Sequence, residues 1–266
     1  MLGKLKSEII HAGHIQCIGA ILIVLSTSIF FDLPISWNLL LLVYLLFYTF
    51  YLFNRAMELP IDLITNPERT RHLLLYKSKI PIILFCVVIL IGLLLILINN
   101  YEIIFFTLTF LLFGILYTLK AKKLTRQIPL FKNFYVALCF GLLVFYPFIY
   151  NNATIGRYAR LLFLVIILKV VLIQILADFK DLNSDKLEKL KTMPVLIGKE
   201  KTLIFLFFLS LLFSAFFALI HPLFFLTFIY NFIIYKIAIK NERLAYFLST
   251  GEFALWLLLT YVSKII

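Results

Sequence analysis

Nine long apolar runs dominate this sequence and restrict the folds that it can adopt. They lie near residues 14–31, 35–53, 80–98, 102–119, 134–150, 159–177, 202–219, 223–240 and 246–263. Each is close to the roughly 17 to 25 residues that an α-helix needs to cross the hydrocarbon core of a bilayer. None of the runs alternates apolar and polar residues as the strands of a membrane barrel do. We therefore expect an all-α, polytopic membrane bundle of about nine transmembrane helices, forming a single domain over residues 1–266.

The composition argues against a soluble bundle with an enlarged core. Of the 266 residues, 64% are hydrophobic and only 14% are charged, whereas a soluble domain has about 25% charged residues. The net charge of +12 is compatible with nucleic-acid binding. However, the basic residues lie in short loops between the apolar runs, where they fix orientation and contact anionic headgroups. We expect membrane lipids, and not nucleic acid, to be the partners of these charges.

Positively charged residues are distributed unequally between two sets of loops. The loops after the second, fourth, sixth and eighth apolar runs hold most of the lysines and arginines. The opposite loops and the C-terminal end hold only Arg157, Arg160 and Lys264. Cytoplasmic loops of membrane proteins carry such an excess of Lys and Arg. The asymmetry predicts a multi-pass cell-membrane protein whose N-terminus and basic loops lie on the cytoplasmic side.

Most acidic residues lie in two polar segments, which follow the second and the sixth apolar runs. In the first segment, Asn54 and Glu58 are four residues apart, so they share one face at the end of a helix. Pro60 is expected to loosen the helix, which leaves Asp62 on a following turn. Both segments fall on the side of the bundle that the basic loops predict to be cytoplasmic.

In the second segment, three carboxylates are spaced so that they line one stripe of a helix end: Asp178, Asp181 and Asp185. Like charges at this spacing repel one another, so a cation is needed to neutralise them. Mg²⁺ is the natural candidate, because it is bound through one or two carboxylates together with phosphate oxygens and water. The alternative is a solvated, acid-rich helix end beside Lys180 and Lys186. Two acidic segments on one side of the bundle favour the metal site.

Both acidic segments resemble motifs of the UbiA superfamily of intramembrane prenyltransferases, which have nine helices. The first motif has the form N-D-x-x-D-x-x-x-D and the second the form D-x-x-x-D. The residues that fall on them are Asn54, Glu58 and Asp62 in the first, and Asp181 and Asp185 in the second, with Asp178 as a further acid. The stretch T-M-P-V-L-I-G at 192–198 resembles the T-L-P-x-x-x-G of the family, and Tyr117 to Lys120 and Lys132-Asn133 resemble its helix-four exit.

The first motif departs from the family pattern at two positions. Arg55 and Glu58 both stand where the family usually has Asp, and Pro60 between the acids is also unusual. We expect a first metal site that is less acidic than is typical. Arg55 either pairs with Glu58 or contacts a phosphate directly, and we favour the second because its planar guanidinium binds phosphate oxygens in a bidentate way.

The resemblance implies Mg²⁺-dependent transfer of a prenyl group from a polyprenyl diphosphate to a lipophilic acceptor, either an aromatic quinone precursor or a lipid alcohol. It implies catalytic roles for Glu58, Asp181 and Asp185. The oxygen ligands of Mg²⁺ would be Asn54, Glu58, Asp62, Asp178, Asp181 and Asp185. The cations expected to contact the diphosphate are Arg55, Arg69, Lys120 and Lys180.

Few polar residues interrupt the apolar runs, and Lys169, near the middle of the sixth, is the most costly to insert. We expect it to face a cavity or a partner, and specifically to line the central chamber of the bundle. Intramembrane polar residues are also the usual mark of transporters. Two alternative functions therefore stay open: a small membrane transporter, and a protein that binds lipid diphosphates without turnover.

Overall fold

The computed structural model describes residues 8–9, 12–65, 67–219 and 222–265, and every regular element among them is helical. Eight helical segments are long and apolar enough to cross a membrane, and a shorter apolar helix of 17 residues precedes them. The predicted bundle of about nine transmembrane helices is confirmed. The spans are α2 (His14–Phe30), α3 (Trp37–Thr65), α5 (Ile80–Ile98), α6 (Tyr101–Leu116), α8 (Phe131–Leu142) with η3 (Leu143–Phe145) and α9 (Tyr146–Tyr150), α10 (Arg157–Lys180), α13 (Lys199–Ala218), α14 (Leu226–Lys240), and α15 (Glu242–Thr250) with α16 (Glu252–Ile265).

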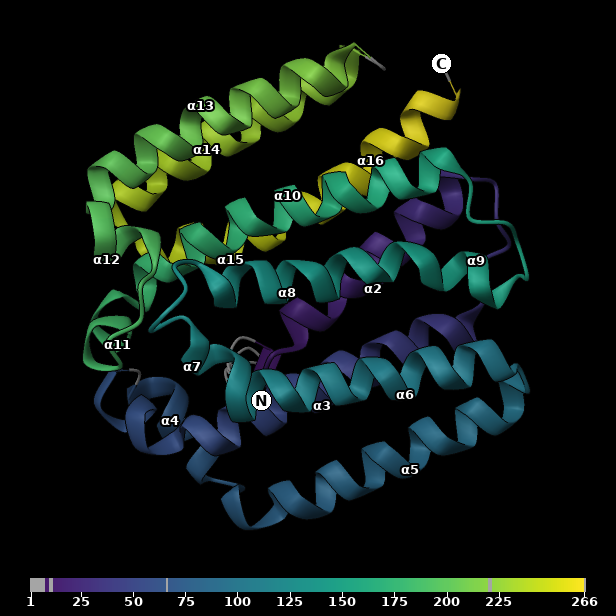
Figure 1. Ribbon diagram of the computed structural model, residues 1–266, viewed down its shortest axis with the longest axis horizontal. Coiled ribbons are helices and arrows are strands. Elements are labelled where there is room, and N and C mark those ends of the chain that lie inside the picture. Colours follow the sequence, from purple (N-terminus) through teal and green to yellow (C-terminus); the bar gives the residue numbers. More distant parts are fainter. Residues whose placement is uncertain (1–7, 10–11, 66, 220–221, 266) are drawn as a thin grey trace.

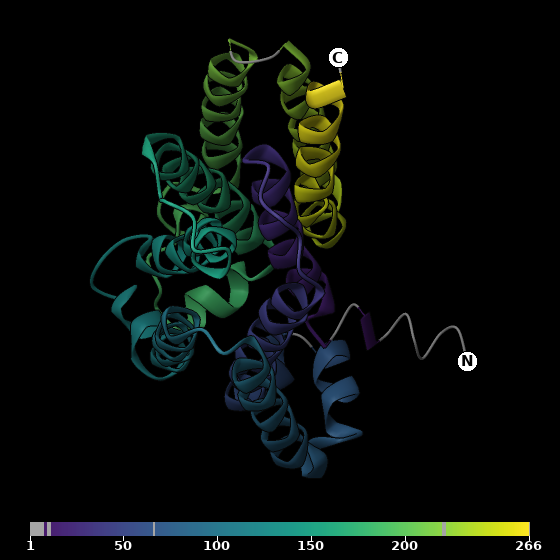
Figure 2. The same cartoon turned by 90° about the vertical axis from the view of Figure 1, so that its right-hand side faces the viewer.

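Four short helices and the charged loops that join them gather at one end of the bundle, which we call the polar end. The helices are α4 (Pro67–Leu74), α7 (Lys122–Leu124), α11 (Leu182–Leu187) and α12 (Met193–Ile197), and Figure 1 shows them together on the left. The C-terminal end of α16 lies at the opposite end (Figure 1), which faces the viewer in Figure 2. The loops rich in Lys and Arg thus share one end, as the charge asymmetry requires.

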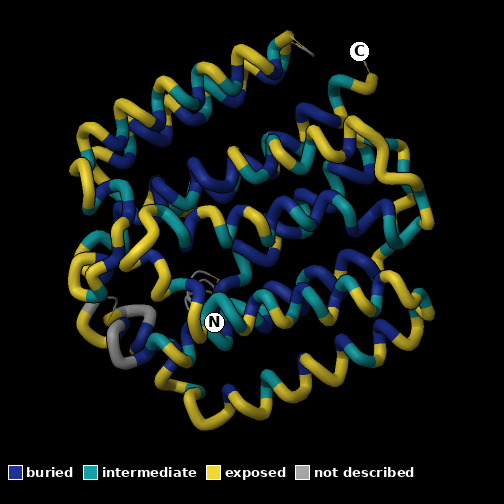
Figure 3. Tube along the Cα trace, in the orientation of Figure 1, coloured by how far each residue is buried: buried dark blue, intermediate teal, exposed yellow. Residues whose placement is uncertain are grey.

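Helices at the rim of the bundle expose apolar side chains, while those at its centre bury them. On α5, Phe85 and Ile96 are 66% and 72% exposed, and the outer sides of α5 and α13 appear yellow in Figure 3. In contrast, α10 buries almost every side chain from Lys169 to Phe179. Because lipid tails solvate apolar groups, such exposed faces are stable only in a bilayer. The central position of α10 places its last turn inside the polar end.

Helix α3 extends further than predicted, through Pro60 to Thr65. The expectation that Pro60 loosens the helix before Asp62 is not met, because α3 continues over both residues as one helix. A proline removes only its own hydrogen bond and otherwise kinks a helix, so the flanking turns can continue. Asn54, Glu58 and Asp62 consequently follow one another at four-residue intervals on a single helix.

Two local breaks shape the interior. A π-helical turn, η2 (Tyr117–Ala121), links α6 to α7, and the Lys122 N–H donates to the carbonyl of Tyr117, five residues earlier. At the other side of the bundle, Gly251 separates α15 from α16. A Cβ at Gly251 would lie 2.9 Å from the Tyr230 hydroxyl and 3.0 Å from the Leu248 carbonyl oxygen, so a larger residue would require the Tyr230 side chain to shift.

Candidate active site

A cavity of about 170 Å³ lies at the polar end, with walls from α3, η2, α8, α10, α11 and α15. All six predicted oxygen ligands line it: Asn54, Glu58, Asp62, Asp178, Asp181 and Asp185. The first three come from α3, and the others come from the end of α10 and from α11. Two segments more than a hundred residues apart in the sequence thus face one space, as the acidic motifs predict.

The first wall is the stripe on α3. Thr118, in η2, donates a hydrogen bond of 3.2 Å to the amide oxygen of Asn54, which leaves the other lone pair of this oxygen available to a ligand. Glu58 is half-buried, and Asp62 is only 3% exposed. The stripe therefore runs from a hydrogen-bonded amide to a buried carboxylate along one face of the helix.

The second wall carries two buried carboxylates held by one lysine. The ammonium of Lys132, at the start of α8, lies 3.0 Å from Asp178 Oδ1 and 2.7 and 2.8 Å from the two oxygens of Asp185. Asn133 donates a further bond of 2.8 Å to Asp178 Oδ2. Burial raises the pKa of the Asp185 carboxyl above the usual range of an aspartate, and the Lys132 ammonium opposes that shift.

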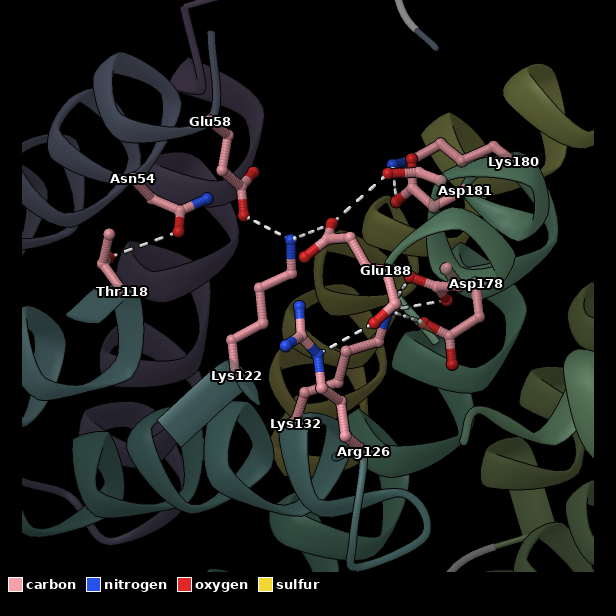
Figure 4. A network of polar contacts seen from close by, with 12 residues as sticks. Asn54, Glu58, Thr118, Lys122, Arg126, Lys132, Asp178, Lys180, Asp181 and Glu188 are labelled. Atoms are coloured by element: carbon pink, nitrogen blue, oxygen red, sulfur yellow. Dashed lines mark hydrogen bonds and ion pairs between the residues drawn. The ribbon is translucent and has the colours of Figure 1, made fainter. Parts of the chain in front are cut away.

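A second lysine joins the two walls. The Lys122 ammonium lies 2.6 Å from Glu58 Oε1 and 2.8 Å from Glu188 Oε1, so it bridges α3 to the turn that follows α11 (Figure 4). Arg126 supports this turn by donating from Nε to the carbonyl oxygen of Glu188 at 2.9 Å. The walls are therefore connected across the cavity by charge-assisted bonds, which are stronger than neutral ones.

The structure places Lys122, and not the predicted Lys120, in the cavity. Lys120 is exposed and does not line this space. In an α-helix, residues three and four positions after Tyr117 share its face, which would select Lys120. The i→i+5 geometry of the π turn instead aligns Lys122 with Tyr117. A π turn leaves no simple pattern in the sequence, so periodicity could not identify Lys122.

Two of the other predicted cations line the cavity. Lys180 contacts Asp181 at 2.6 Å, and Arg55 is buried at the wall with its guanidinium 6.0 Å from the centre of the Tyr51 ring. The side chain of Arg69 lies outside the described residues. Sequence reasoning missed the roles of Lys132 and Glu188. The resemblance of Lys132-Asn133 to a family motif is the signal that points to this pair, and both residues contact the second acidic segment.

The inner part of the cavity is aromatic. Phe47, Phe50 and Phe140 line it below the charged groups, together with Tyr51 and Tyr117. A Cβ on Gly114 would lie 2.1 Å from the Phe50 ring, so glycine at this position allows the ring to pack flat against α6. The cavity thus combines a charged mouth with an apolar, π-rich interior.

The donor groups fit Mg²⁺ in chemistry, but they do not form a closed cage. Carboxylate and amide oxygens are the ligands that Mg²⁺ prefers. Among the described residues, no three His, Cys, Asp or Glu side chains converge tightly enough to hold an ion by themselves, and lysines contact several of the carboxylates. Because Mg²⁺ commonly takes only one or two protein carboxylates and completes its shell with phosphate oxygens and water, this open arrangement suits an ion that binds together with a diphosphate.

Lys169 does not line this cavity, which corrects the expectation that it faces the central chamber. It is 2% exposed, and its ammonium pairs with the carboxylate of Glu252 at the start of α16. Glu252 also accepts a bond of 3.1 Å from Asn231. The broader expectation, that the Lys169 side chain faces a partner and not lipid, is met. The partner could not be identified from the sequence, because it lies on a helix 83 positions further along the chain.

The chain is similar to known proteins over almost its whole length. A model described as the UbiA prenyltransferase family matches residues 15–260. A structure described as digeranylgeranylglyceryl phosphate synthase has a TM-score of 0.60 and 21% identity, covering 98% of each chain. The apo structure of a UbiA homologue from Aeropyrum pernix K1 has a TM-score of 0.71 and 13% identity, covering 94% of this chain and 98% of that one. The search of curated proteins found no match.

Proposed function

The chain belongs to the UbiA prenyltransferase family, and from that premise we propose that it transfers a prenyl group from a polyprenyl diphosphate to a lipophilic acceptor in a Mg²⁺-dependent reaction. The reaction takes place at the polar end, which we propose to be cytoplasmic. The observation that carries the proposal is the single cavity onto which both acidic segments converge, with lysines at its mouth and aromatic rings in its depth.

The charges at the mouth suit a diphosphate. A prenyl diphosphate carries about three negative charges, and both its binding and its departure require their neutralisation. Lys122, Lys180 and Arg55 line the cavity and can donate to phosphate oxygens. Lys132 keeps Asp178 and Asp185 paired and in position at the opposite wall. Bound Mg²⁺ would supply Lewis acidity at the diphosphate oxygens, with Asn54 and the carboxylates of the two motifs as its protein ligands.

The reacting carbon lies, in this proposal, at the boundary between the charged mouth and the aromatic interior. The bond between the allylic carbon and the diphosphate oxygen breaks, and its electron pair leaves with the diphosphate. An electron pair of the acceptor forms the new bond to carbon, and the acceptor releases a proton. Tyr51, Tyr117 and Phe50 can stabilise developing positive charge on the allylic carbons through their π faces. They also exclude water, which would otherwise capture the cation.

Two acceptor classes remain in the proposal: an aromatic quinone precursor and a lipid alcohol. The spacing of Asp178, Asp181 and Asp185 resembles that of members that build archaeal ether lipids, and one similar structure is described as digeranylgeranylglyceryl phosphate synthase. These points make a glycerol-lipid alcohol the first acceptor to test.

One observation favours a second function, the binding of lipid diphosphates without turnover. Lysines already contact Glu58, Asp178 and Asp185 in this structure, so a diphosphate could be held by cations alone. The two functions differ in whether the allylic C–O bond is broken.

The test uses the full-length protein in lipid nanodiscs. Geranyl, farnesyl and geranylgeranyl diphosphates are offered with each acceptor class, with Mg²⁺ or with EDTA, and products are identified by mass spectrometry. We expect a prenylated acceptor and released diphosphate only with Mg²⁺. Tight binding of the diphosphates without product, for every acceptor, would instead support the non-catalytic function. Uptake of an unaltered donor into proteoliposomes would support a transporter.

A further inference from the structure

A second cavity lies in the half of the bundle away from the polar end. It has a volume of about 210 Å³ and is lined by side chains of α2, α10, α13, η4 and α16 that are almost all apolar, among them Ile23, Val165, Ile166 and Trp256. On α10 the first cavity reaches inward to Gln174, and the second begins at Ile166. Eight residues of helix separate these positions, or about 12 Å along the axis.

A stacked pair of aromatic rings lies between the two cavities. Phe140 lines the first cavity and Phe253 lines the second. Their ring centroids are 6.2 Å apart and their planes differ by 7°, and both side chains are 5% exposed. The two cavities therefore lie one after the other from the polar end toward the far side of the bundle, and this aromatic pair separates them.

Phe253 is held in place from two sides. The preceding residue, Glu252, pairs with Lys169 in the buried core, which anchors the first turn of α16. On the other side, a Cβ on Gly19 would lie 3.3 Å from the Phe253 ring, so the ring rests against the backbone of α2. A buried ion pair and a tight backbone contact give the ring little freedom to turn aside.

We propose that the Phe140–Phe253 pair is a floor that limits the length of the prenyl chain accepted by the first cavity, and that the distal isoprene units of a longer chain would occupy the second cavity if the floor were removed. This inference rests on the proposed prenyl-donor function. The chain of a donor bound by its diphosphate at the polar end runs inward along the aromatic wall and meets Phe140. Phe253 then blocks its further extension, so short donors are bound without penalty and long ones must bend or leave units outside.

Shortening Phe253 tests the floor directly. In Phe253→Leu we expect the ratio of kcat/KM for geranylgeranyl over geranyl diphosphate to rise about tenfold or more, since a few methylenes in an apolar pocket discriminate by that factor. Val165→Phe, added to this variant, refills the second cavity and is expected to return the ratio toward that of the wild type. Phe148→Leu is the matched control, because Phe148 is 4% exposed and packs on an aromatic ring, that of Phe31, but lines neither cavity.

The affinities of the same variants for non-hydrolysable thiolodiphosphates of each length give a second readout. Wild-type protein that binds the analogues without turning over donors would contradict the proposed enzyme, yet the length preference would still be measured. A length ratio in folded Phe253→Leu that equals the wild-type ratio, by both readouts, overturns the floor. A shift of the same size in Phe148→Leu also overturns it. Failure of the wild type to bind an analogue of any length would overturn both proposals.

Discussion

Lys132 contacts both carboxylate oxygens of Asp185, at 2.7 and 2.8 Å, although the two residues are 53 positions apart. Both side chains are at least 90% buried. A buried charge without a partner destabilises the folded state, so each of these residues offsets the desolvation cost of the other. The contact joins the start of α8 to α11 and gives the second acidic segment a defined shape before any ligand arrives.

This pairing predicts that the two motif acids, Asp181 and Asp185, differ in their effect on stability. Both Asp181→Asn and Asp185→Asn are expected to abolish turnover. Asp181 is the more exposed, with 24% of its side chain accessible, so its substitution should barely change the melting temperature. Asp185→Asn should lower the free energy of unfolding by about 3 kcal/mol. This is the lower end of the cost of breaking a buried ion pair, because Asp178 still contacts Lys132. Thermal unfolding in detergent measures both; equal melting temperatures would contradict the prediction.

The π turn predicts different roles for two neighbouring lysines. Lys122→Met should raise the KM for the donor about tenfold or more, because it removes a charge-assisted contact from the cavity. Lys120→Met is the matched control, since Lys120 is exposed and outside the cavity, and it should behave as the wild type. Steady-state kinetics on both variants measures this. The same KM for both would show that Lys122 does not contact the donor.

Arg55 is predicted to contact the diphosphate. Arg55→Ala should weaken donor binding and raise the Mg²⁺ concentration needed for half-maximal rate, because the guanidinium supplies part of the neutralising charge. Glu58→Gln should slow turnover. Titration of Mg²⁺ against rate for both variants separates this role from a silencing pair between Arg55 and Glu58. Under the pairing view, Arg55→Ala would leave the rate unchanged or raise it.

The buried pair of Lys169 and Glu252 predicts a strong coupling between their substitutions. Each single change, Lys169→Met or Glu252→Gln, should lower the free energy of unfolding by about 3 kcal/mol, because it leaves a buried charge without its partner. The double variant should be more stable than either single one. A double-mutant cycle of unfolding free energies measures the coupling. Additive effects would mean that the two side chains do not interact.

The excess of Lys and Arg at the polar end predicts that this end faces the cytoplasm. In a cysteine-free background, Lys186→Cys at the polar end should react with a membrane-impermeant maleimide only after the inner face is made accessible. Arg157→Cys, at the opposite end, should react from outside in intact cells. Both side chains are exposed, so access is not limited by burial. The reverse pattern would invert the topology.

Periodicity and run length in the sequence were enough to predict the helices and the two acidic stripes. Both depend on local geometry: the length of a span is set by the bilayer, and carboxylates three or four residues apart share a helix face in any fold. Asp178, Asp181 and Asp185 could therefore be grouped without coordinates, although the structure divides them between α10, the residue that ends it, and α11. Local rules failed at three places in the backbone: at Pro60, where α3 continues without a break, at the π turn that presents Lys122, and at Asp181, where α10 ends and α11 begins.

The partners of these acids were decided by tertiary structure alone. Lys122 meets Glu58 and Glu188, 64 and 66 positions away, and Lys132 meets Asp185 because α8 packs along α10. Lys132 stands out in the sequence only through the resemblance of Lys132-Asn133 to a family motif, and nothing in the sequence distinguishes Lys122 from the many lysines that orient the chain in the membrane. Which lysine becomes buried beside a carboxylate depends on how the helices pack, and that is a property of the whole bundle and not of any segment. The same holds for the aromatic pair between the two cavities, whose members come from α8 and α16.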